Sequence, residues 1–148
     1  HCLVAPKGHP ILAERSITLA TLARWPLITY DPAFAGRSKI SGAFERAQLE
    51  PNIVLAAIDS DVIKTYVGLG LGLGIIASMA YDPARDVGLQ AVDVGHLFGS
   101  NTTRIGLRRG TYLRRFEYDF IELFAPQLGR KAVDMAMAGT GNQDEYQL

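Results

Sequence analysis

Three consecutive residues, Gly36, Arg37 and Ser38, have the types and the place in the chain to bind an anion. They follow the strand-like PLITY in the segment TYDPAFAGRS, which begins at Thr29, and they open a predicted helix. The first amides of a helix lack intrahelical partners and, together with the helix dipole, attract negative charge. Gly36 permits close approach, and Arg37 can add charge-assisted hydrogen bonds. The alternative is an ordinary capped helix start with a solvated arginine.

A second predicted helix start, AIDSDV, places Asp59 and Ser60 directly after another apolar run. Either side chain is a good N-cap, and capping would occupy the same amides that an anion needs. Asp59 and Asp61 also repel an anion, although they suit the ammonium group of an amino-acid ligand. Capping is therefore the favoured role for this pair.

A run of alternating glycines, Gly68 to Gly74 in YVGLGLGLGIIAS, raises the question of a phosphate-binding loop. Gly72, Gly74 and Ala77 satisfy the bare spacing of a dinucleotide fingerprint, which requires a strand before the glycines and a helix after them. The order here is reversed, because DVIKTYV has a helical pattern and GIIA a strand pattern. We interpret the run as a helix C-terminus with a tight crossing into the sheet, and we expect no cofactor.

The totals of the sequence exclude several classes of protein. The 148 residues carry a formal net charge of zero, so the chain has no bulk attraction for nucleic acid. Cys2 is the single cysteine, which rules out a disulfide framework and fits a reducing cytoplasm. The three histidines lack metal-ligand spacing, no G-x-S-x-G motif occurs, and no apolar run is long enough to cross a bilayer. We expect neither an enzyme, nor a metalloprotein, nor a membrane protein.

The elements that would position these residues alternate between strands and helices, which predicts an open, mostly parallel α/β sheet. The expected strands are 1–6, 26–30, 52–58, 73–77 and 103–109. The expected helices are 18–24, 37–48, 59–69, 111–126 and 130–138. Ligands on such sheets bind at the carboxyl ends of strands, where both candidate helix starts lie.

Burial can also be predicted from the apolar patterns. Residues 52–58 are almost continuously apolar, as in a parallel strand covered on both faces. On the helix 59–69, the residues expected to be buried are Val62, Ile63, Tyr66 and Val67. On the helix 111–126, the expected apolar stripe is Leu113, Phe116, Phe120, Ile121 and Phe124.

The order of these motifs resembles the effector-binding domain of LysR-type transcriptional regulators, and more narrowly the CysB-like branch. The resemblance rests on PLITYDPAFAGRSKISGAFERAQLEPNIVLAAIDSDVIKTYVGLGLGLGIIASMAYDP and TTRIGLRRGTYLRRFEYDFIELFAPQL. The GRS loop, DSDVIKTYVGLGLGLGIIASMA and YDFIELFAP are specific to that branch. It extends from His1 to about Ala138.

The resemblance implies a type-2 periplasmic-binding-protein-like fold, with two α/β subdomains and an effector in the cleft between them. Residues 1–99 would form the second subdomain with its entry crossing strand. Residues 100–128 would form the returning strand and helix of the first subdomain, and residues 129–148 a C-terminal helix and polar tail. A helix-turn-helix, a linker helix and most of the first subdomain are expected to lie outside this sequence.

The resemblance also implies a function and a site. CysB-like proteins control genes of sulfur assimilation and cysteine biosynthesis, and they bind sulfate-sized anions or acetylated serine. A pocket threonine precedes GRS in that branch, and Ala35 stands in its place here. The candidate effector-binding residues are therefore Thr29, Ala35, Gly36, Arg37, Ser38, Asp59 and Ser60.

Partners and location follow from the same resemblance. The protein is expected to be a cytoplasmic homodimer or homotetramer that contacts DNA only through the absent helix-turn-helix. One alternative is a solute-binding protein of a transporter with the same fold. The other is an α/β enzyme that binds a nucleotide at the glycine run.

Overall fold

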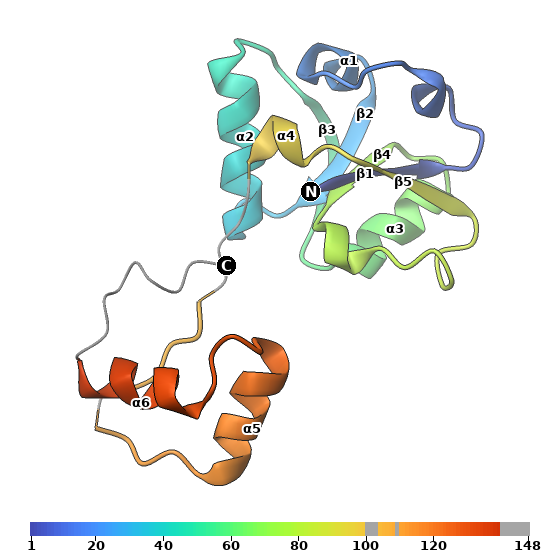
Figure 1. Ribbon diagram of the computed structural model, residues 1–148. Coiled ribbons are helices and arrows are strands. Elements are labelled where there is room, and N and C mark those ends of the chain that lie inside the picture. The colour runs from blue at the N-terminus through green and yellow to red at the C-terminus, as the bar shows by residue number, and fades with distance from the viewer. Residues whose placement is uncertain (100–103, 109, 140–148) are drawn as a thin grey trace. The chain divides into compact units, whose positions relative to one another are not determined.

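A computed structural model describes residues 1–99, 104–108 and 110–139, except for the side chain of Ala35. The chain divides into two compact units, His1–Asn101 and Thr102–Leu148, each with its own apolar core. The first unit contains a sheet flanked by helices, and the second contains two helices (Figure 1). None of the helices in the described ranges has the length and apolar character needed to span a membrane.

The strands of the first unit are β1 (Cys2–Pro6), β2 (Pro26–Tyr30), β3 (Asn52–Ala57), β4 (Leu73–Ile76) and β5 (Leu89–Asp93). Its helices are η1 (Pro10–Ala13), α1 (Leu19–Ala23), α2 (Ala35–Arg46), α3 (Ser60–Gly68), η2 (Ser78–Ala80) and α4 (Gly95–Phe98). The helices of the second unit are α5 (Arg115–Phe124) and α6 (Arg130–Ala138).

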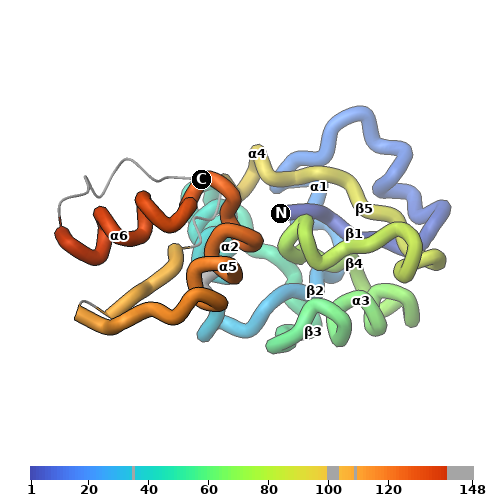
Figure 2. Tube along the Cα trace, turned by 60° about the horizontal axis from the view of Figure 1, so that its bottom comes forward, coloured from blue at the N-terminus to red at the C-terminus, as the bar shows by residue number. Residues whose placement is uncertain are grey.

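The sheet has the strand order β3-β2-β4-β1-β5, which can be followed in Figure 2. Strand β2 pairs in parallel with β3 and β4, whereas β1 pairs antiparallel with both β4 and β5. The α/β class is confirmed, but the sheet is mixed, because β1 runs against its two neighbours. The sequence does not reveal this reversal, since β1 is buried along most of its length and lacks the alternation of a half-exposed strand.

Strand β3 corrects one prediction about burial. It lies at the edge of the sheet, and its side chains alternate between exposed and partly buried until Ala57, which is buried. The register with β2 shifts after the pair Leu27–Ile53, so Val54 is the extra residue of a bulge and is 43% exposed. Every second side chain of β3 is exposed, so one of its faces is open and the expected cover on both faces was wrong.

Each face of the sheet packs against helices through an apolar cluster. One cluster joins one face of the sheet to α1, α2 and α4, with Leu22, Leu27, Phe44 and Phe98 among its buried side chains. The other joins the opposite face to α3 through Ile63 and Val67. Val62 and Tyr66, also expected to be buried, are 41% and 40% exposed, because a helix turns only one narrow stripe toward the sheet.

The second unit contains a small core of Leu113, Ile121 and Val133, where α5 packs against α6. Helix α5 begins at Arg115, later than expected. The residue before it, Arg114, is the N-cap, and its amide donates to Oε2 of Glu117 at 2.6 Å. Residues 104–108 form no strand, contrary to the prediction, because no described strand pairs with them.

The expected stripe on α5 is confirmed for Leu113 and Ile121 only, and Leu113 lies just before the helix. Phe116, Phe120 and Phe124 are exposed, at 63%, 66% and 54%. Within this unit α6 covers only one side of α5, so it shields one edge of a wide apolar face and leaves the aromatic edge open.

Candidate functional site

Helix α2 begins at the carboxyl end of β2 and supplies the first candidate site. It starts at Ala35 after Phe34, which makes no side-chain capping bond in the described structure. The start lies two residues before the one expected, so the Arg37 amide is not unpaired: it donates to the carbonyl oxygen of Phe34 at 3.0 Å. Ala35 and Gly36 instead hold the first two helical positions, whose amides have no intrahelical acceptor.

The Arg37 side chain is fixed beside this helix start. Its Nη1 donates to the carbonyl oxygen of Tyr30 at 3.0 Å, and its Nε donates to Oγ of Ser41 at 3.1 Å. A guanidinium has five N–H donors, and these two described bonds use two of them. Its positive charge is thereby held next to the first turn of α2. Ser38 lies on that turn with an exposed side chain.

Two residues that the sequence analysis did not select form the wall around Gly36. A methyl group placed on Gly36 would stand 3.7 Å from Nε2 of His1 and 3.8 Å from Cδ2 of Tyr30. His1 also packs edge-on against Phe98, with ring centroids 5.5 Å apart. Its place beside α2 follows from its position just before β1, far from Gly36 in sequence, so no local pattern indicated it.

Thr29 supports the site from inside the sheet. Its side chain is fully buried, and its hydroxyl donates to the carbonyl oxygen of Ile75 in β4 at 3.2 Å. That bond ties β2 to β4 and uses the hydroxyl hydrogen. Thr29 therefore helps to fix the strand from which the α2 loop departs.

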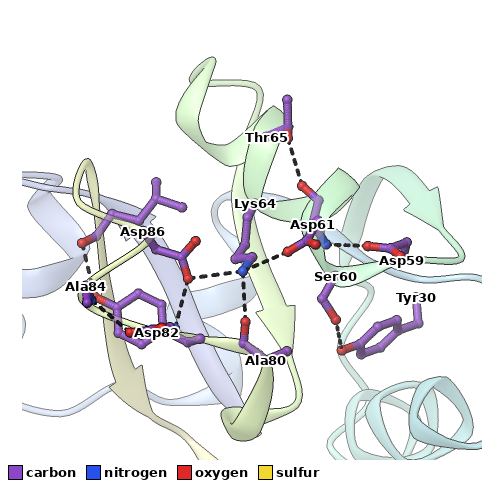
Figure 3. A network of polar contacts seen from close by, with 12 residues as sticks. Tyr30, Asp59, Ser60, Asp61, Lys64, Thr65, Ala80, Asp82, Ala84 and Asp86 are labelled. Carbon is purple, nitrogen blue, oxygen red and sulfur yellow. Dashed lines mark hydrogen bonds and ion pairs between the residues drawn. The ribbon is translucent and has the colours of Figure 1, made fainter.

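The second candidate pair lies at the start of α3. Asp59 is the N-cap, and its Oδ1 accepts from the Asp61 amide at 2.6 Å, so the capping role is confirmed. The hydroxyl of Ser60 lies 2.8 Å from the hydroxyl of Tyr30 and is hydrogen bonded to it (Figure 3). These oxygens are therefore bound within the protein, where they stabilise the start of α3.

A surface pocket of about 510 Å³ opens beside the start of α3, with Asp59, Ser60 and Lys64 in its lining. The Lys64 ammonium is the central charge there, and it is already bound (Figure 3). It donates to the carbonyl oxygen of Ala80 at 2.9 Å and pairs with Asp61 at 2.9 Å and Asp86 at 3.1 Å. The lining also contains Arg85, but Asp59, Asp61 and Asp82 outnumber the two cations there, so the pocket is a poor anion site.

The Lys64 contacts shift the pKa of both buried partners. Burial alone would lower the pKa of Lys64, but the hydrogen bonds and charges of Asp61 and Asp86 outweigh it and raise that pKa. Burial alone would raise the pKa of Asp86, but the Asp82 amide and the Lys64 ammonium outweigh it and lower that pKa. The network therefore stabilises the charged forms and ties α3 to the segment after η2.

Acid is expected to remove the contribution of Asp86 to stability. A lowered native-state pKa means that this contribution is present above the ordinary value of 3.8 and is lost as the pH falls further. Lys64 acts in the opposite pH range. Because its pKa is raised in the native state, its contribution to stability is present below 10.5 and is lost at higher pH. Urea unfolding of the protein and of Asp86→Asn should differ at about pH 7 and converge as the pH falls below 3.8. A difference that stays constant would contradict the assignment.

The glycine run adopts the predicted order of helix, turn and strand. Gly70 has φ of 79°, its amide donates to the carbonyl of Val67, and the Leu71 amide donates to that of Tyr66. These bonds form a Schellman motif, which ends α3 at a left-handed glycine. Gly72 then passes against the backbone of Pro26. The run is thus a C-cap and a close crossing, which removes the structural reason for a nucleotide loop. No cluster of potential metal ligands occurs among the described residues.

A comparison against protein families identifies the family to which this α/β unit belongs. The model of the LysR substrate binding domain matches residues 1–129. The chain belongs to this family, which has a periplasmic-binding-protein-like fold.

Among individual proteins, the chain is 54% identical over 148 residues to the HTH-type transcriptional regulator CysB of Burkholderia cenocepacia, covering all of this chain and 47% of that protein. It is 53% identical over 133 residues to the regulator SsuR of the same organism, covering 90% of this chain and 43% of that protein. The cofactor-binding domain of the Cbl transcriptional regulator has a similar solved structure, with a TM-score of 0.83 and 42% identity, covering 93% of this chain and 60% of that one. The chain spans about half the length of the CysB and SsuR relatives.

Proposed function

We propose that this chain is the effector-sensing portion of a LysR-type regulator of sulfur assimilation and cysteine biosynthesis genes. Its effector would be a small anion, either sulfate or an acetylated serine. The relatives named CysB, SsuR and Cbl support the class of regulator. The choice of ligand rests on the helix start described above.

The observation that carries the proposal is the start of α2. Ala35 and Gly36 are the first two residues of a twelve-residue helix, and amides at these positions have no intrahelical acceptor. Arg37 adds a positive charge that Tyr30 and Ser41 hold in place. Ser38 lies on the same turn with an exposed side chain. An anion would therefore meet backbone donors and a fixed cation together.

The proposed mechanism is a shift between existing arrangements of the effector domain. A ligand that contacts α2 on one side and the rest of the domain on the other favours the arrangement in which both contacts exist. DNA contact would belong to a helix-turn-helix outside this sequence, and the protein would act in the cytoplasm as a homodimer or homotetramer. No catalytic step is required. Asp59 and Ser60 would contribute by holding α3 beside the site.

Substitution of Gly36 tests the site. A methyl group at this position would make only ordinary contacts with His1 and Tyr30, so Gly36→Ala should keep the fold. We expect it to weaken sulfate or acetylserine binding severalfold, and the larger Gly36→Val to weaken it about tenfold or more, because the side chain covers the amides. Isothermal titration of the intact protein measures this, and circular dichroism checks the fold.

Gly42→Ala is the matched control for that experiment. It adds a methyl group to the same helix, where the near neighbour is the flexible end of Arg46. Its affinity for the effector should equal that of the unmodified protein. Equal affinity in Gly36→Val would refute the site. A ligand that binds but does not alter affinity for promoter DNA would favour a transport solute-binding protein over a regulator.

A further inference from the structure

The hydroxyl of Tyr30 connects three segments that are distant in sequence. Tyr30 is the last residue of β2, and its hydroxyl oxygen accepts from the Ala77 amide, just after β4, at 3.0 Å. The same oxygen lies 2.8 Å from Oγ of Ser60, the first residue of α3. A phenol can accept one hydrogen bond and donate another, so one side chain satisfies both neighbours. Figure 3 shows the ring of Tyr30 directed at Ser60.

The rest of Tyr30 contacts the start of α2. Its ring lies 3.8 Å from the position of a methyl group on Gly36 and 6.3 Å, centroid to centroid, from the ring of Phe34. Its carbonyl oxygen accepts from Nη1 of Arg37 at 3.0 Å. The ring and the backbone of Tyr30 therefore contact the first turn of α2, while its hydroxyl is hydrogen bonded to the first residue of α3.

The described contacts of the loop between β2 and α2 include one backbone bond to the sheet. The Asp31 amide donates to the carbonyl oxygen of Ala57 at 2.9 Å, and the Asp31 carboxylate accepts from the Ala33 amide within the loop at 2.9 Å. Phe34 gives α2 no side-chain cap in the part of the chain described. Helix α2 is also held by Ile40 and Phe44 in the core, but Tyr30 is the residue whose described contacts join its first turn to the start of α3.

From these contacts we propose that Tyr30 is the positioning residue of the effector site. It holds the first turn of α2 at a fixed place relative to the starts of α3 and η2, so that the amides and Arg37 are arranged before the ligand arrives. A prearranged site loses less ordering entropy on binding. This inference rests on the proposed function for its ligand, but the positioning itself is a property of the free protein.

Tyr30→Phe tests the inference, because it keeps the ring and removes only the hydroxyl. In the intact protein we expect the dissociation constant for sulfate or acetylserine to rise about five- to tenfold. Without ligand, amide hydrogen exchange of residues 33–41 should accelerate by a similar factor. Ser60→Ala should shift affinity in the same direction, and the double variant should shift it less than the product of the two single effects.

Tyr81→Phe is the matched control, because it removes another partly buried tyrosine hydroxyl, which donates to the carbonyl oxygen of Leu89 at 3.2 Å. A purely structural role would make the two variants alike in affinity and exchange, and that result would overturn the proposal. So would faster exchange with unchanged affinity. If the unmodified protein binds neither ligand, the proposed function fails, and the exchange comparison alone decides whether Tyr30 holds the loop.

Discussion

Replacing Lys64 with methionine is expected to lower the free energy of unfolding by about 3 kcal/mol. The Lys64 and Asp86 side chains are 10% and 12% exposed, so the substitution leaves a nearly buried carboxylate without its cation. Asp86 keeps the Asp82 amide at 2.9 Å, which limits the loss to the lower part of the range for broken buried pairs. The Ala80 carbonyl loses its donor as well. Urea denaturation at neutral pH measures the change.

Two comparisons separate this loss from a general effect of substitution. Arg115→Met removes an exposed cation 3.9 Å from Asp119 and should change stability by less than about 0.5 kcal/mol. Adding Asp86→Ala to Lys64→Met should cost less than the two single changes summed, because the second substitution removes the unpaired charge. A small effect of Lys64→Met, or strict additivity, would show that the pair is not the link between α3 and the segment after η2.

A methyl group at Gly72 is expected to destabilise the protein by about 2 kcal/mol or more. The Cβ of Gly72→Ala would stand 2.6 Å from the carbonyl oxygen of Pro26 and 3.0 Å from its carbonyl carbon. Both are backbone atoms, so β2 and β4 would have to separate where Leu27 pairs with Leu73. Thermal and urea unfolding of the variant measure the cost.

Gly68→Ala serves as the control from the same run of glycines. Gly68 is the last residue of α3, and a methyl group there would meet nothing within 4 Å. The substitution should stabilise the protein by about 0.5–1 kcal/mol, because it restricts the unfolded chain. If Gly72→Ala were equally harmless, close approach would not explain the glycine at that position.

Local signals predicted the helices and strands of the first unit well. Helix α1 forms within the predicted range 18–24: Oγ1 of Thr18 accepts from the Thr21 amide at 3.1 Å, and the helix ends before Pro26. The interpretation of the glycine run as a helix C-terminus was correct. A helix that ends at a left-handed glycine is determined by residues adjacent in the sequence, so a local pattern can reveal it. The start of α2 was placed two residues late, since neither a capping side chain nor a proline marks it.

Burial was less predictable than the elements themselves. The apolar pattern of β3 suggested a strand with two covered faces, yet its edge position leaves Val54 exposed. The same limitation applies to Tyr66 on α3 and Phe120 on α5, which continue an apolar pattern on faces that no described element covers. A pattern records which residues can be buried, whereas the neighbouring elements determine which ones are.

The sequence by itself determined the α/β class, the family, the presence of helices after β2 and β3, and the role of the glycines, because each depends on residues near one another in the chain. Only the tertiary structure placed His1 beside Gly36, joined Tyr30 to Ala77 and Ser60, and paired Lys64 with Asp86. The antiparallel direction of β1 was likewise visible only in the tertiary structure. Strand order brings these residues together, and it is decided by the packing of whole elements, for which a local pattern has no signal.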